Sequence, residues 1–407
     1  MSLVDHPDSE RARELAERTR DLMEEVVLPF ERDLAPGESV SPDGLATLRE
    51  AAHDYGVYCP QMPTEYGGMG ESFRDSLAVF EEAGRSLLGP PALRVDAPDE
   101  GNMHTIELAG TDEQKERWLP PLIEGEARSA FSMTEPAPGG GSDPKMLQTT
   151  AEKDGDEWVI DGHKWWTSNG YEADVFLVMA RTDQEKHPYE GCSLFLVPAA
   201  TDGVELVRDV PAMESAVLDL SHAEVRYDGV RVPEENLLGA ENDGFRIAQQ
   251  RLGPARLTHC MRFCGMADRA LGVARAYMRN RDAFGSSLEE KQSLRHRMAE
   301  RELDLHGTRT MTRDAARRVS GGDEARLPVA MCKVRAARMI QETVDFAIQC
   351  CGGAGLSRDL PLVDFYEGMR FFRIGDGADE VHLRSIARAA FADEHVAEAD
   401  LGNLPQF

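Results

Sequence analysis

The amino-acid sequence predicts a mainly α-helical protein with a β-rich domain in its middle. Long apolar stripes with helical spacing occupy both ends of the chain, whereas short apolar runs bounded by Gly, Asp and Pro fill the centre. A length of 407 residues is too great for one ordinary core and suggests two or three domains. We therefore expect an N-terminal helical domain over 1–130, a β-domain over 131–235 and a C-terminal helical domain over 236–407.

The first domain is expected to consist of helices joined by loops rich in Pro and Gly. Ser9 is a candidate N-cap for a helix whose apolar stripe comprises Leu15, Leu22, Met23, Val26, Val27 and Phe30. A further helix is expected between Gly110 and Gly125, stopped by Pro120 and Pro121.

The middle domain is expected to be a small antiparallel β-barrel or sandwich. Its strand-like runs are WVI (158–160), VFLVMA (175–180) and SLFLV (193–197), each bounded by turn-forming residues. No internal repeat is evident.

The last domain shows apolar stripes long enough to predict an antiparallel four-helix bundle. The two clearest stripes repeat every three or four residues and comprise Leu257, Cys260, Met261, Cys264, Ala267, Leu271, Ala274 and Met278, followed by Ala330, Val334, Ala337, Ile340, Val344 and Ala347.

Composition excludes several classes of protein. A net charge of -28 argues against nucleic-acid binding, and the scarcity of lysine (7 of 45 basic residues) resembles proteins of salt-adapted organisms. The absence of an apolar run near ~20 residues and the acidic first ten residues predict a soluble cytoplasmic protein without membrane insertion. The seven cysteines lack metal-ligand spacing, so no metal is expected.

Two polar motifs stand close together in the middle domain: FSMTEPAPGGGSDP (131–144) and IDGHKWWTSNG (160–170). Their hydroxyls, glycines and indoles suit a flat, polar-edged, phosphate-bearing ligand such as a flavin nucleotide. The glycine run alone is weak evidence, because many such runs are flexible loops. Either tryptophan, considered alone, could also belong to the core.

The paired motifs resemble the middle domain of the acyl-CoA dehydrogenase family of FAD enzymes. The resemblance implies that Phe131, Met133 and Thr134 line the flavin ring. It also implies that Trp166 packs against the isoalloxazine and that Ser168 lies near N5. Ser142 resembles the serine of the family's G-S-D motif, near phosphate or pantetheine, although the loop before it is about two residues longer here.

Two further segments, NRDAFGSSLEEKQ and QCCGGAG, also resemble family motifs. In the family they reach the FAD pyrophosphate and adenosine of a neighbouring subunit, which implies a homodimer or homotetramer. The residues concerned are Arg281, Phe284, Gln292, Gln349, Gly352 and Gly353. An arginine fork pairs well with phosphate oxygens, whereas the alternative reading of Arg281 is a solvated helix end.

The catalytic base of most family members is a glutamate, and FYEG (365–368) makes Glu367 a tempting candidate. Counting about fifteen residues from Pro361, as the family's register implies, leads instead to Asp376 in RIGDGADEVHLRSIAR. Gly375 and Gly377 could let this shorter side chain approach its substrate. Some family branches place the base on the first bundle helix, where this chain has Ala255. Arg256 matches a family arginine and is expected to position groups or act electrostatically, unless it forms a purely structural ion pair.

The expected reaction is α,β-dehydrogenation of an acyl-CoA to the trans-2-enoyl-CoA in fatty acid β-oxidation, with electrons passing to an electron-transfer flavoprotein. The alternatives are a flavin oxidase of the same fold, resembling acyl-CoA oxidase or nitroalkane oxidase, and a catalytically idle binding subunit. GPARLTHCMR, DGADEVHLRS and APDEGNM resemble most the aspartate-bearing subgroup, which in animals is fused behind a phosphotransferase-like domain. We expect that domain to be missing here.

Overall fold

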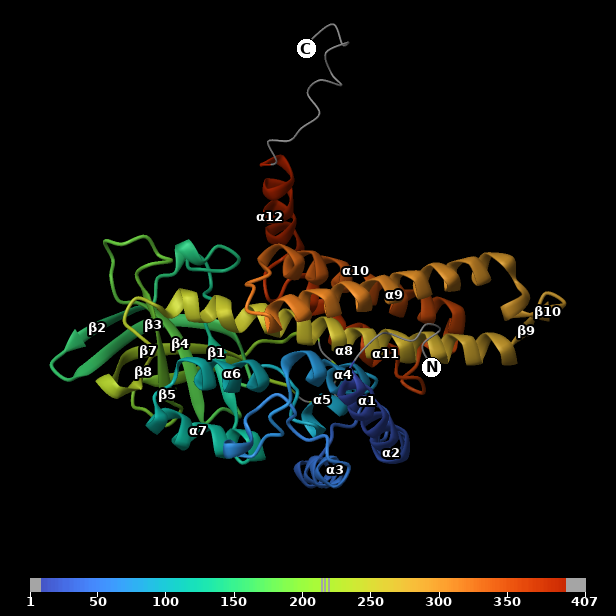
Figure 1. Ribbon diagram of the computed structural model, residues 1–407, viewed down its shortest axis with the longest axis horizontal. Coiled ribbons are helices and arrows are strands. Elements are labelled where there is room, and N and C mark those ends of the chain that lie inside the picture. The colour runs from blue at the N-terminus through green and yellow to red at the C-terminus, as the bar shows by residue number, and fades with distance from the viewer. Residues whose placement is uncertain (1–8, 214, 216, 219, 393–407) are drawn as a thin grey trace, which may run out of the picture.

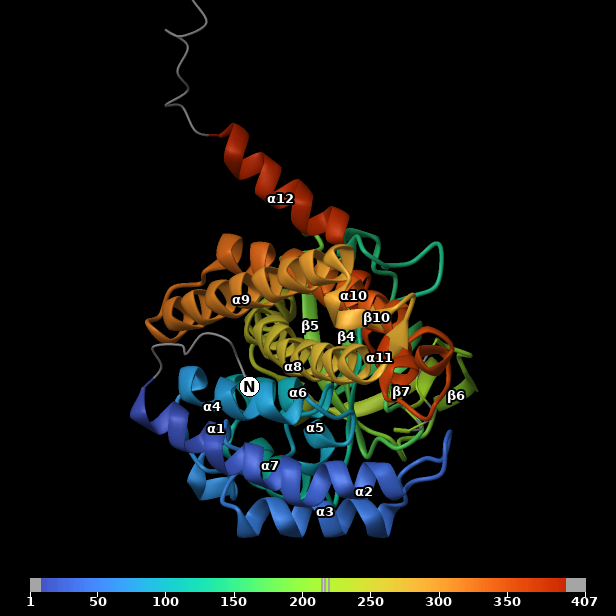
Figure 2. The same cartoon turned by 90° about the vertical axis from the view of Figure 1, so that its right-hand side faces the viewer.

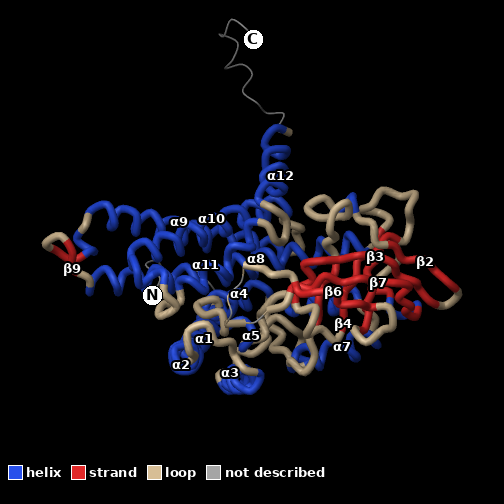
Figure 3. Tube along the Cα trace, turned by 180° about the vertical axis from the view of Figure 1, so that it is seen from behind, coloured by secondary structure: helices blue, strands red, loops and turns tan. Residues whose placement is uncertain are grey.

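The molecule has a central β-sheet with helices before and after it in the chain. The computed structural model describes residues 9–213, 215, 217–218 and 220–392. The strands of the main sheet gather at one end, and the long helices extend from them to the other end, where β9 lies (Figure 3). The predicted fold class is therefore confirmed. Among the described residues, no helix has both the length and the apolar character needed to span a membrane.

The N-terminal helices lie beneath the bundle and beneath the sheet (Figure 1). The predicted cap is confirmed, because the Ser9 hydroxyl accepts a hydrogen bond from the Ala12 N–H. The helices are α1 (Glu10–Leu22), α2 (Leu28–Asp33), α3 (Pro42–Asp54), α4 (Phe73–Ala83), α5 (Gly89–Ala92), α6 (Asp99–Ala109) and α7 (Asp112–Glu124), with a π-helical turn η1 (Met23–Val27) between α1 and α2.

The expectation that Pro120 and Pro121 stop a helix was wrong. Helix α7 continues through both prolines to Glu124, where Gly125 adopts a left-handed φ of 77° and caps it. Each proline removes one backbone donor and crowds the carbonyl four residues before it. The capping box at Thr111 and Gln114 and the Gly125 cap secure the two ends of the helix.

The sheet is mainly antiparallel and runs in the order β6-β7-β3-β2-β4-β5-β8. The antiparallel expectation fits most pairs, but β1 pairs with β4 in parallel, and β2 meets β4 in parallel at one position. The strands are β1 (Ser129–Ser132), β2 (Thr150–Asp154), β3 (Glu157–Ser168), β4 (Val175–Arg181), β5 (Cys192–Pro198), β6 (Val204–Asp209), β7 (His222–Pro233) and β8 (Leu237–Leu238).

Strands β4 and β5, in the middle of the sheet, are buried on both faces. Alternate residues of β4 face different cores: Leu177 packs with the helices, whereas Phe176 and Val178 pack with strands β3, β5 and β7. This alternation follows from the two-residue repeat of a strand. The sheet is thereby fixed against the bundle on one side.

The bundle is built on α8 (Gly244–Asn280), which runs from the sheet to a small hairpin, β9 (Asp282–Ala283) and β10 (Ser286–Ser287). Helix α9 (Gln292–Ser320) returns towards the sheet, and α10 (Arg326–Cys351) runs outward again. The turn η6 (Gly352–Leu356) then leads to α11 (Leu362–Arg370), η7 (Phe371–Arg373) and α12 (Asp379–Phe391). Helix α12 projects away from the rest of the molecule (Figure 2).

Candidate active site

The two polar motifs of the middle domain lie side by side. The Trp165 N–H donates to the Thr134 carbonyl at 3.0 Å, and Lys164 Nζ donates to the Met133 carbonyl at 2.9 Å. The segment after β1 is therefore held against the end of β3. The segment that carries Phe131, Met133 and Thr134 thus lies beside the segment that carries Trp166 and Ser168. Their contact with a flavin stays a prediction.

The surface formed by these residues is partly open. Trp166 lies in a register irregularity of β3 with a left-handed φ of 54°, and its side chain is 43% exposed. Ser168 Oγ is hydrogen-bonded to His222 Nδ1 at 2.9 Å. Within the described residues, the buried amide nitrogen of Asn169 has no hydrogen-bond partner. An exposed indole, hydroxyls and an unsatisfied donor fit the edge of a flavin ring.

The carboxylate of Glu135 organises the loop that follows. It accepts hydrogen bonds from the N–H groups of Gly140, Gln148 and Thr149, from the Thr149 hydroxyl and from Lys164 Nζ. Burial lowers the pKa of Lys164 to about 8, and Glu135 opposes that shift. Burial raises the pKa of Glu135, but Lys164 and the hydrogen bonds outweigh it and leave that pKa lowered. Sequence reasoning missed this pair, although both residues lie in the motifs.

Ser142 lies in the same loop, where it is exposed. The lengthened loop thus presents Ser142 at the surface, and its predicted contact with phosphate or pantetheine stays a prediction.

Asp376 lies between η7 and α12 in an unusual backbone conformation. Its φ is 54°, and its carbonyl accepts hydrogen bonds from Arg256 Nε at 2.9 Å and His382 Nε2 at 3.1 Å. The side chain is 20% exposed, while its Oδ2 is buried without a hydrogen-bond partner in the described part of the chain. Burial raises the pKa of Asp376, but His259 and Arg256 outweigh it and hold that pKa below its usual value. The carboxylate is therefore ionised at neutral pH.

Arg251 connects Asp376 with the flavin-lining segment. Its guanidinium lies 4.3 Å from the centre of the Phe131 ring and donates to Asn102 Oδ1 at 3.0 Å. Burial lowers the pKa of Arg251, and the nearby carboxylates of Asp376 and Glu100 oppose that shift. The predicted base and the predicted flavin-lining strand thus share one electrostatic environment. Sequence reasoning did not find Arg251, because only the packing of α8 reveals it.

The other candidate bases lie elsewhere or cannot act. Glu367 is on α11 and pairs with Arg358 at 2.8 Å, while Ala255 on α8 offers no ionisable group. The assignment of the base to Asp376 stays a prediction.

The second predicted cluster lies at the opposite end of the bundle. The hairpin after α8 carries Arg281 and Phe284, and it lies far from the sheet in Figure 1. Because α9 starts beside this hairpin and α10 ends at the same end, the remaining members also lie there: Gln292, Gln349, Gly352 and Gly353. Phe284 is 98% exposed. One chain therefore does not bring the two predicted clusters together.

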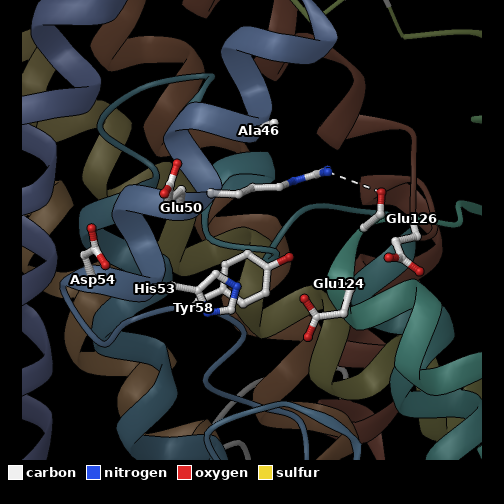
Figure 4. Close-up of a pocket in the computed structure, with 9 residues that line it drawn as sticks. Ala46, Glu50, His53, Asp54, Tyr58, Glu124 and Glu126 are labelled. Atoms are coloured by element: carbon white, nitrogen blue, oxygen red, sulfur yellow. Dashed lines mark hydrogen bonds between the residues drawn. The ribbon is translucent and has the colours of Figure 1, made fainter.

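A pocket of ≈ 430 Å³ lies on the N-terminal helices and contains none of the predicted site residues (Figure 4). The Tyr58 and His53 rings stack within it at 3.8 Å, and Arg49 donates to the Gly125 carbonyl at 3.3 Å. Its acidic lining residues are Glu50, Asp54, Glu124 and Glu126. In the described part of the chain, no group of three or more His, Cys, Asp or Glu could hold a metal ion.

Comparisons with known proteins agree with this geometry. Three family models match in order: the N-terminal domain of acyl-CoA dehydrogenase at residues 9–126, the middle domain at 130–230 and the C-terminal domain at 242–391. The matches and the fold define an FAD-dependent oxidoreductase. The chain belongs to the acyl-CoA dehydrogenase family.

Individual relatives are similar over almost the whole chain. A Mycobacterium tuberculosis protein named as a probable acyl-CoA dehydrogenase is 39% identical, covering 96% of this chain and 98% of its own length. Acyl-CoA dehydrogenase family member 11 of Gallus gallus is 36% identical over 95% of this chain, which spans 51% of that relative. A solved acyl-CoA dehydrogenase homologue from Mycobacterium abscessus superposes with a TM-score of 0.88 at 35% identity, covering 95% of this chain and 99% of its own.

Proposed function

We propose that this acyl-CoA dehydrogenase oxidises an acyl-CoA thioester to the trans-2-enoyl-CoA with Asp376 as the base. The observation that carries the proposal is the ionised, partly exposed carboxylate of Asp376, which shares the environment of Arg251 with the Phe131 segment. A carboxylate whose pKa lies below neutrality is ready to accept a proton, and its remaining exposure offers a route to the substrate.

Asp376 would take the α-proton of the acyl chain, and the freed electron pair would form the new double bond. FAD, when bound, supplies the acceptor for the β-hydrogen, which leaves as hydride. The left-handed backbone at Asp376, between Gly375 and Gly377, would help this short side chain to approach the substrate. Arg256 positions the base through the Asp376 carbonyl, and its positive charge favours the ionised carboxylate.

The flavin ring would lie against Phe131, Met133, Thr134 and Trp166, with Ser168 at its polar edge. The distant cluster at the end of the bundle would hold the pyrophosphate and adenosine of the cofactor belonging to a second copy. The separation of the two clusters within one chain and the exposure of Phe284 support a homodimer or a dimer of dimers. Ser142 would reach phosphate or pantetheine.

We propose that an electron-transfer flavoprotein accepts the electrons and that the enoyl product enters fatty acid β-oxidation. The net charge of -28 supports a salt-rich cytoplasm as the setting. An oxidase of the same fold would differ in using O2 as the acceptor, and the first experiment separates the two.

In that experiment the purified protein is mixed anaerobically with each of a panel of saturated acyl-CoAs. The absorbance of the flavin is recorded after each mixing. Bleaching by one chain class would establish the half-reaction and the substrate class. Reoxidation of the bleached enzyme by electron-transfer flavoprotein, but only slowly by O2, would support the dehydrogenase. Rapid reoxidation by O2 would favour an oxidase, and no bleaching by any thioester would contradict the proposal.

A further inference from the structure

His259 lies beside the carboxylate of Asp376. Its Nδ1 is 3.6 Å from Asp376 Oδ2 and 2.9 Å from the Ala255 carbonyl oxygen. Because a carbonyl oxygen only accepts hydrogen bonds, Nδ1 must carry a proton. The Nδ1–H group is therefore directed at the carbonyl. Asp376 Oδ2 lies beyond hydrogen-bond length from Nδ1, but near enough for the Nδ1–H dipole to act on its charge.

Three phenylalanine rings fix the orientation of this imidazole. Phe372 stacks on it with ring centres 5.2 Å apart and an interplanar angle of 12°. Phe371 meets it edge-on at 5.8 Å, and Phe263 lies tilted at 6.2 Å. Because His259 is buried among them, its ring plane is held in place.

The imidazole acts as a neutral donor near neutral pH. Burial and the positive charge of Arg262 lower the pKa of His259 to about 4, although Asp376 and the hydrogen bond to Ala255 oppose the shift. The other charged or titratable groups that influence this pair come from four helices: Arg251, Arg256 and Arg262 of α8, Glu100 of α6, Lys333 of α10 and His382 of α12.

The backbone of Asp376 is held by hydrogen bonds from residues that the structure describes, but its carboxylate is not. Arg256 and His382 hold its backbone carbonyl, but neither bonds its carboxylate, and Oδ2 is buried without a hydrogen-bond partner among the described residues. The backbone is thus fixed while the rotation of the side chain is not. The ion-pair contact that the described residues give to Oδ2 comes from His259.

We propose that His259 is a positioning residue, whose Nδ1–H attracts Asp376 Oδ2 and so turns the other carboxylate oxygen towards the substrate. The inference rests on the proposed function, in which Asp376 takes the α-proton. During that step the α C–H bond breaks and an O–H bond forms on Asp376. The C–H electron pair forms the double bond as the β-hydrogen leaves as hydride, and His259 neither gains nor loses a proton.

The first test compares His259→Phe, which keeps a flat ring without a donor, with His259→Gln, whose amide can donate. In His259→Phe, kcat should fall roughly 10- to 100-fold with little change in KM, because the base is misplaced. The acid limb of the kcat/KM profile should move to higher pH, because the ionised carboxylate loses the nearby Nδ1–H dipole, which favours its charged form. His259→Gln should recover part of both effects.

Cys264→Ala is the matched control, since Cys264 is a buried neighbour on α8 that faces α4 and α9. It should leave the acid limb in place. An even loss of kcat in both His259 variants at every pH, with no shift of the acid limb, would mean a merely structural role and would overturn the proposal.

The second test needs no turnover. NMR of the FAD-bound protein labelled with 15N-histidine, assigned with His259→Phe, should show Nδ1 protonated and Nε2 unprotonated at pH 7. Asp376→Asn should then shift the Nδ1 resonance. An unprotonated Nδ1, or a resonance indifferent to Asp376→Asn, would overturn the proposal. If the NMR pattern is found but no acyl-CoA bleaches the wild-type flavin, the proposed reaction has failed rather than the His259 contact.

Discussion

Lys164 Nζ lies 2.9 Å from Glu135 Oε1 and equally 2.9 Å from the Met133 carbonyl oxygen. One buried ammonium therefore ties the loop organised by Glu135 to the segment that would line the flavin. The ion pair lies inside the protein, and removal of one partner would leave the other charge buried without its counter-charge.

Lys164→Met should lower the free energy of unfolding by roughly 3–5 kcal/mol, because the Glu135 carboxylate is left buried without its counter-charge. FAD occupancy should fall as well, since Met133 loses its hydrogen bond. Urea unfolding and the ratio of flavin to protein absorbance measure the two effects. The double variant with Glu135→Gln should recover part of the stability. Lys153→Met removes an exposed pair with Glu234 and should change little. Equal effects of the two lysine variants would contradict this account.

Asp376→Asn should retain FAD but bleach the flavin with acyl-CoA about 10²- to 10⁴-fold more slowly, the usual contribution of a general base. Glu367→Gln should remain close to the wild type, because Glu367 only pairs with Arg358 on the surface of α11. Anaerobic stopped-flow absorbance gives both rates. The opposite ranking of the two variants would move the base to Glu367.

Arg281→Ala should bind FAD roughly 10- to 100-fold more weakly, as expected when one hydrogen bond to a charged group is lost. Flavin titration followed by fluorescence measures the affinity. Arg279→Ala is the control, because Arg279 lies two residues earlier and pairs with Glu289 at 3.0 Å. Unchanged affinity in Arg281→Ala would exclude this arginine from the cofactor site.

Acid should destabilise the protein between about pH 6.5 and 4. Burial, aided by Arg256, lowers the pKa of His382 from 6.5 to about 4. In this range the unfolded chain binds a proton that the folded chain does not, so stability falls as pH falls. His382→Gln cannot titrate and should flatten the dependence in urea unfolding at pH 4.5–7. The slope should shrink rather than vanish, because burial also lowers the pKa values of His104 and His259. An unchanged slope would contradict the assignment.

Salt should raise the melting temperature. A net charge of -28 repels itself, and the screening length shortens from about 10 Å at 0.1 M to about 3 Å at 1 M salt. Calorimetry in KCl from 0.1 to 2 M should show a rising Tm. A flat or falling Tm would contradict the view that salt stabilises this protein by screening its negative charge.

Much of the fold follows from local patterns in the sequence. The Ser9 cap and the stripe that begins with Leu15 depend on neighbours within a few residues, so they could be predicted. The continuation of α7 through Pro120 and Pro121 could not, because the rest of the helix and its two caps outweigh the lost backbone donors. Parallel pairing of β1 with β4 also depends on contacts far apart in the chain.

The candidate site divides in the same way. Motif spacing led to Asp376 and Arg256, whose contact the structure contains. Arg251 lies outside the quoted motifs, and His259 lies within GPARLTHCMR, but no spacing assigned a role to either residue. They enter the site because successive turns of α8 face α6 on one side and the segment after η7 on the other. How a long helix packs against two segments far away in the chain is a tertiary property. It cannot be predicted from a few neighbouring residues.

Helix α8 is 37 residues long, which corresponds to about 55 Å. It carries Arg256 and His259 near the sheet, and it ends at the hairpin of Arg281. In the proposed dimer each helix therefore serves two active centres, one in each copy. Two inactive chains could then complement each other: pairing Asp376→Asn with Arg281→Ala places both defects in one centre and leaves the other centre intact.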